Sequence, residues 1–66
     1  MQSAVLNTRD AATYLGLSKP TMERMRVEGD GPSFVKMGAA VRYRLIDLDK
    51  WMAARVVGST SQKIAA

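Results

Sequence analysis

Two helix-forming segments separated by only three residues, Gly16-Leu17-Ser18, constrain this chain more than any other feature. Asn7 precedes the first segment and can accept a hydrogen bond from a free amide in the first turn of a helix. Asp10, three residues later, is placed as in a capping box. Gly16 can take the left-handed conformation that ends many helices. So short a connection predicts a helix-turn-helix, with a first helix over residues 8–15.

The second segment runs from Ser18 to Gly29 and carries its own start and stop signals. Ser18 can cap the helix, Pro20 is tolerated in the first turn, and Gly29 can end it. Met22 and Met25 are three residues apart and therefore share one face. Charged and hydroxylated side chains are distributed around the rest of the helix, namely Lys19, Thr21, Glu23, Arg24 and Arg26. By itself, this pattern suits either plain helical architecture or a helix that reads DNA.

A β-hairpin is predicted after the turn cluster Asp30-Gly31-Pro32. Its strands fall at residues 34–36 and 41–44, around a connection at 37–40. The second strand alternates apolar and basic side chains, with Val41 and Tyr43 facing one way and Arg42 and Arg44 the other. We expect the apolar face to lie on the core. The basic face is either an ordinary solvated surface or part of a binding site.

A third helix is predicted from Leu45 to Arg55. Leu48, Trp51 and Met52 recur at helical spacing, so we expect them to be buried, with Trp51 as the largest single contribution to the core. The adjacent Leu45 and Ile46 leave two possibilities. Either both cover the base of the hairpin, or one is exposed and available to a partner.

The two ends of the chain carry weaker patterns. Residues 1–6 are expected to form a loose lead-in, anchored on the core by Val5 and Leu6. Residues 57–66 are small and polar with little periodicity, and they predict a flexible C-terminal tail. Residues 1–56 are therefore expected to form the single folded domain.

Composition excludes several classes of function. The 66 residues include no cysteine and no histidine, so we expect no disulfide, no metal site and no cofactor. An enzyme is not expected either, because no histidine base and no cysteine nucleophile are present. The net charge of +4 is compatible with a nucleic-acid partner. No apolar run is long enough for a membrane span and no secretory signal is present, so we expect a cytoplasmic protein.

The chain resembles a known family through three motifs in a fixed order. LNTRDAATYLGLSKPTMERM is followed by EGDGPSFVKMG and then by VRYRLIDLDKWM. This series is similar to the small winged helix-turn-helix proteins of the excisionase and AlpA-like group, whose fold is related to the DNA-binding domain of MerR-type regulators. The likeness covers residues 6 to about 54. It implies a mainly α fold with three helices and a two-stranded wing.

The resemblance also implies where DNA would be contacted. The second helix would enter the major groove and present Ser18, Lys19, Thr21, Glu23, Arg24 and Arg26. The wing would position the protein through Lys36, Arg42 and Arg44. Members of this family often carry basic residues at the wing tip, where this chain has Ala39 and Ala40. We therefore expect weak binding by one protomer and cooperative binding by neighbouring copies.

Within this family we expect an excisionase, or recombination directionality factor, that binds double-stranded DNA and assists an integrase. A domain this small with no effector-binding segment suits such an architectural role, and no small-molecule ligand is expected. Two alternatives stay open. The protein is a transcriptional regulator of mobile-element genes, or it is a protein-interaction module built on the same fold.

Overall fold

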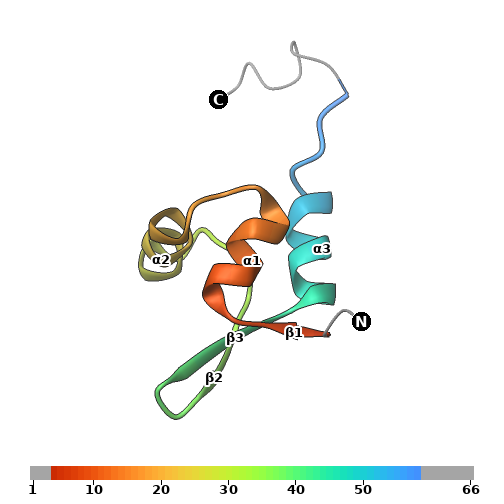
Figure 1. Ribbon diagram of the computed structural model, residues 1–66. Coiled ribbons are helices and arrows are strands. Elements are labelled where there is room, and N and C mark those ends of the chain that lie inside the picture. Colours follow the sequence, from red (N-terminus) through yellow and green to blue (C-terminus); the bar gives the residue numbers. More distant parts are fainter. Residues whose placement is uncertain (1–3, 59–66) are drawn as a thin grey trace.

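The computed structural model describes residues 4–58, which form three helices and a small antiparallel sheet (Figure 1). The elements in chain order are β1 (Val5–Leu6), α1 (Thr8–Leu15), α2 (Lys19–Glu28), β2 (Val35–Met37), β3 (Ala40–Arg44) and α3 (Leu45–Ala53). The predicted mainly α architecture with a β-hairpin is confirmed. Figure 1 shows α1 between α2 and α3, with the β2–β3 hairpin extending away from the helices. No helix within residues 4–58 is long and apolar enough to cross a membrane.

The helix ends follow the predicted capping residues. The Asn7 side chain accepts a hydrogen bond from the Asp10 amide at 2.7 Å, and Ser18 Oγ accepts one from the Thr21 amide at 3.3 Å. Gly16 and Gly29 end α1 and α2 in the left-handed conformation, with φ of 75° and 84°. The helix-turn-helix is therefore set by contacts within a few residues along the chain.

The sheet contains a strand that the sequence analysis missed. The strand order is β1-β3-β2, and β1 pairs antiparallel with β3 through Val5 opposite Arg44 and Leu6 opposite Tyr43. The prediction of a loose lead-in at residues 1–6 is wrong for this part of the chain. Pairing with β3 satisfies backbone groups of Val5 and Leu6 while Leu6 packs against the core. A strand of two residues is too short to show an alternating pattern in the sequence.

The hairpin is tighter than predicted. β2 and β3 pair from Val35 opposite Arg42 to Met37 opposite Ala40, which leaves a two-residue turn at Gly38 and Ala39. Gly38 has φ of 62°, a conformation that glycine adopts at little cost in such turns. The uncharged Ala39 and Ala40 therefore lie at the turn and at the first residue of β3.

The core is built around Tyr43 instead of Trp51. Among residues 4–58 the buried cluster that forms the hydrophobic core consists of Ala11, Ala12, Met22, Tyr43 and Leu48, and Tyr43 is the largest of them. Trp51 is only half-buried, so its predicted role as the main core residue is wrong. Its Nε1–H donates to the backbone oxygen of Asp30 at 3.3 Å, and the Arg55 guanidinium lies 4.0 Å from the centre of its ring. The indole needs a partner for its N–H, and it finds one at the rim of the domain.

Leu45 and Ile46, the adjacent pair at the start of α3, differ in burial. Leu45 packs against the core, whereas the side chain of Ile46 is 56% exposed. Ile46 is thus exposed and available to a partner, as in the second possibility given for this pair. α3 ends at Ala53, two residues before the predicted end. Of the predicted tail at residues 57–66, residues 59–66 lie outside the described part of the chain.

Candidate nucleic-acid interface

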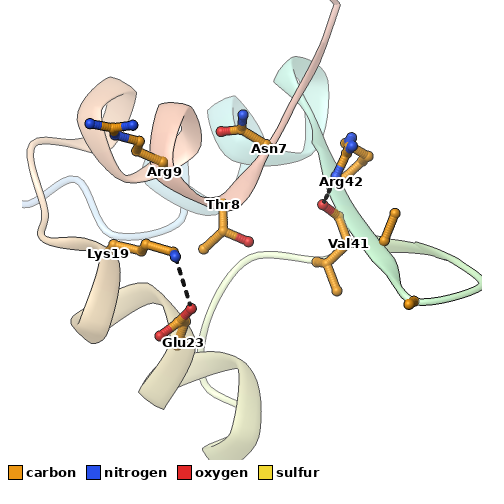
Figure 2. Close-up of a pocket in the computed structure, with 9 residues that line it drawn as sticks. Asn7, Thr8, Arg9, Lys19, Glu23, Val41 and Arg42 are labelled. Atoms are coloured by element: carbon orange, nitrogen blue, oxygen red, sulfur yellow. Dashed lines mark hydrogen bonds and ion pairs between the residues drawn. The ribbon is translucent and has the colours of Figure 1, made fainter.

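An open groove of about 420 Å³ lies where the start of α1, the start of α2 and the hairpin meet (Figure 2). It is lined by Asn7, Thr8, Arg9, Lys19, Glu23, Ala39, Ala40, Val41 and Arg42. Each of the three elements supplies one cationic side chain, namely Arg9 from α1, Lys19 from α2 and Arg42 from β3. Against these stands one carboxylate, that of Glu23. The groove is therefore positively charged and open to solvent.

The charged side chains of α2 form two exposed ion pairs. Lys19 Nζ lies 3.7 Å from Glu23 Oε2, and Arg24 Nη1 lies 3.7 Å from Glu28 Oε1. All four side chains are about half exposed or more. Pairs of this kind, four residues apart on a helix, stabilise it by only about 0.2–0.5 kcal/mol. The cations are therefore held near the helix surface and can exchange their partners for a phosphate or a base at little cost.

Two hydroxyls stand at the beginning of α2. Ser18 Oγ and Thr21 Oγ1 are 2.8 Å apart and share a hydrogen bond, in addition to the capping bond of Ser18. Ser18 is exposed and Thr21 is half-buried. The free amides of a helix N-terminus attract anions, so these hydroxyls lie at a place suited to a phosphate oxygen.

Arg26 does not join the outward side chains of α2. Its Nη1 donates to Thr8 Oγ1 at 3.2 Å and to Tyr43 Oη at 3.1 Å, and its guanidinium lies 5.9 Å from the centre of the Phe34 ring. Arg26 thus ties α2 to α1 and to the hairpin. Its position four residues after Met22 places both side chains on the same side of the helix, a spacing from which the inward orientation could have been predicted.

The structure separates the three cations predicted on the wing. Arg42 lines the groove, and its Nη1 donates to the backbone oxygen of Val41 at 2.8 Å. Lys36 lies opposite Val41 in the sheet. Because side chains alternate along a strand, Lys36 projects from the other face of the sheet than Arg42 does. Arg42 is therefore the wing cation that lines this groove.

Arg44 forms an ion pair with Asp47 in the first turn of α3. Its Nε and Nη2 donate to the two carboxylate oxygens of Asp47 at 2.7 and 3.0 Å. The hydrogen bond from Arg44 lowers the pKa of Asp47 below its ordinary value and raises that of Arg44. A bidentate pair of this geometry fixes the start of α3 against the end of β3.

The pair predicts an acid-sensitive contribution to stability. Because the pKa of Asp47 is lowered in the folded protein, its contribution is present above about pH 4, the ordinary value for an aspartate, and is lost as the pH falls below it. We expect Asp47→Asn to lower the thermal midpoint at pH 7, and the difference from the wild type to shrink as the pH falls from about 5 to about 2. Thermal unfolding followed by circular dichroism across this range measures it. An equal difference at pH 7 and pH 2.5 would rule the pair out as the cause.

Arg9 was absent from the predicted contact residues. It lies in the first turn of α1, one helix before the predicted reading helix, and nothing in its sequence neighbourhood points to a site. It joins Lys19 and Arg42 because the turn at Gly16-Leu17-Ser18 folds α1 back across α2 and because β3 packs on α1. Its place in the groove is visible only after the helices and the hairpin are assembled.

A helix-turn-helix, a β-hairpin beside it and a cation-lined groove between the two define a winged helix-turn-helix of the DNA-binding class. The chain belongs to the Helix-turn-helix domain family, which it matches over residues 5–56. This match spans all the helices and strands described above and makes DNA the partner of the domain. A comparison with curated proteins gave no match.

Proposed function

We propose that this protein binds double-stranded DNA in a sequence-specific manner and acts as an excisionase, assisting an integrase in excising a mobile element. The observation that supports the DNA-binding mode is the open groove beside α2 that Arg9, Lys19 and Arg42 line. The likeness of the three ordered motifs to excisionase and AlpA-like proteins supports the excisionase role.

In this proposal α2 enters the major groove of DNA. Glu23 and Arg24 point away from the buried Met22 and are placed to meet base edges. Arginine matches the two acceptors of guanine, and glutamate accepts from the amino group of cytosine. Each side chain exchanges a weak intrahelical ion pair for a base contact.

The groove beside α2 receives the phosphate backbone. Arg9, Lys19 and Arg42 belong to the three elements that line this groove, so a strand running along it meets a cation from each of them. The positive end of the α1 dipole adds to this attraction. Contacts of this kind fix the position of the protein on the duplex and carry no sequence information.

The other predicted contact residues divide into two groups. Ser18 and Thr21 stand at the start of α2 and would bind a phosphate, and Lys36 would add a contact from the other face of the wing. Arg26 and Arg44 hold α2 and α3 against the hairpin through the bonds described above, and we propose a positioning role for both. The bidentate pair with Asp47 would have to break before Arg44 reached a phosphate.

The lack of charge at the wing tip affects how many copies of the protein are needed on one DNA site. Gly38, Ala39 and Ala40 bring no charge to the turn, so the tip adds little attraction to the minor-groove phosphates. We therefore propose that neighbouring copies bind side by side and that an integrase is a further partner. The exposed Ile46 is available for such protein contacts.

An excision assay tests the proposal directly. A plasmid carrying the two attachment sites of the element, its integrase and this protein should release a circular product that quantitative PCR detects. We expect omission of the protein, or the double change Arg24→Ala and Arg42→Ala, to reduce the product to the level seen with integrase alone. The double change removes one base contact, worth roughly 1–3 kcal/mol, and one phosphate contact.

The same assay separates the alternatives. Undiminished excision without the protein, together with altered transcription of the neighbouring genes, would show a transcriptional regulator. Full activity of the double variant would show that the fold acts by binding protein and not DNA. Lys50→Ala removes an exposed cation on α3, away from the groove, and serves as the control expected to keep full activity.

A further inference from the structure

Val27 is the most exposed large apolar side chain in the described residues, at 85%. It lies in the third turn of α2, three residues after Arg24 and four after Glu23. Side chains at these spacings are neighbours on a helix surface. Val27 therefore shares the face of α2 that carries the two proposed base-reading side chains.

Neither packing nor helix formation explains a valine at this position. The core-facing side of α2 is the one that buries Met22, and Val27, five residues later, points away from it. A β-branched residue also forms helix less readily than alanine, leucine or lysine does. A polar or straight-chain residue would serve better on a surface that faced only water.

We infer that Val27 reads the methyl group of a thymine in the major groove. This methyl group is the apolar feature that the major groove presents, and aliphatic side chains recognise it by contact. Val27 follows Arg24 by three residues, or about 4.5 Å along the helix axis. Successive bases on one strand are about 3.4 Å apart. The thymine should therefore lie within one or two base steps of the guanine that Arg24 contacts.

This inference rests on the proposed placement of α2 in the major groove, and its test uses DNA with and without the methyl group. Duplexes that the wild-type protein binds are first selected from a random pool. Their thymines are then replaced one at a time by deoxyuridine, which lacks only the methyl group. We expect the wild type to lose about fourfold in affinity at one position, the effect of one buried methyl group.

The variant Val27→Ala, tested on the same duplexes, completes a double-mutant cycle between Val27 and the thymine methyl group. It should bind the thymine duplex about fourfold more weakly than the wild type does and should show no difference between thymine and deoxyuridine at that position. Val56→Ala is the matched control, because Val56 is 78% exposed but lies beyond α3. It should keep both the affinity and the preference of the wild type. Circular dichroism confirms that the variants fold.

The outcomes separate the inference from the proposal beneath it. If the pool yields no bound duplex, both fail. If duplexes bind but no thymine can be replaced with loss of affinity, the DNA-binding proposal stands and the role of Val27 is overturned. The same holds if Val27→Ala keeps the full preference for thymine, because another residue would then read the methyl group.

Discussion

Replacing Tyr43 with alanine is expected to leave most of the protein unfolded at 25 °C. Tyr43 is 1% exposed and is the largest buried side chain in the described core. Its ring packs 6.1 Å from that of Phe34, and its hydroxyl accepts a hydrogen bond from Arg26. Truncating a buried aromatic residue to alanine costs about 3–5 kcal/mol. That is about as much as the whole core of a domain this small supplies.

Urea denaturation followed by circular dichroism measures the effect, with Tyr43→Phe as the control. The control keeps the ring and removes only the hydroxyl that Arg26 contacts, so it should cost about 1 kcal/mol and leave a cooperative transition. A Tyr43→Ala variant that unfolds cooperatively near the wild-type midpoint would show that Tyr43 is not the centre of the core.

The second large effect concerns DNA binding. Replacing Arg9, Lys19 and Arg42 together with alanine is expected to abolish most of the electrostatic attraction of the groove for the phosphate backbone. Each phosphate contact contributes about 0.9 to the slope of log affinity against log salt concentration. The triple variant should therefore bind more weakly at low salt, and its slope should be shallower by roughly 3.

Fluorescence anisotropy over a salt series gives both quantities. The single variants should each reduce the slope by about 1, and Lys50→Ala, outside the groove, should leave it unchanged. None of the three groove cations is buried, so the variants should keep the wild-type fold. A triple variant with the wild-type slope would show that the backbone runs elsewhere on the protein.

The features that sequence analysis predicted well are local ones. The caps at Asn7 and Ser18 and the glycines that end α1 and α2 act through hydrogen bonds that span three to five residues. Such bonds depend only on nearby residue types, so the helix-turn-helix can be read from the chain. The alternation in β3 likewise placed Tyr43 inward and Arg44 outward.

The features that it missed depend on distant contacts. Trp51 meets Asp30 across 21 residues, and Arg26 meets Tyr43 across 17. β1 forms because Val5 and Leu6 pair with the edge of β3, which is distant from them in the sequence. In all three cases a polar group of β1, Trp51 or Arg26 is satisfied by a partner far away in the sequence. No local sequence pattern specifies such a partner.

By itself, the sequence determined the corner that holds Ser18–Gly29 as an exposed, capped helix and the family to which the likeness points. Only the tertiary structure decided which cations stand beside that helix. It turned Arg26 inward, paired Arg44 with Asp47 at the start of α3, and brought Arg9, Lys19 and Arg42 to one groove. The reason is physical: a helix cap is completed within one turn, whereas a site built from three elements exists only once their packing has set the distances between them.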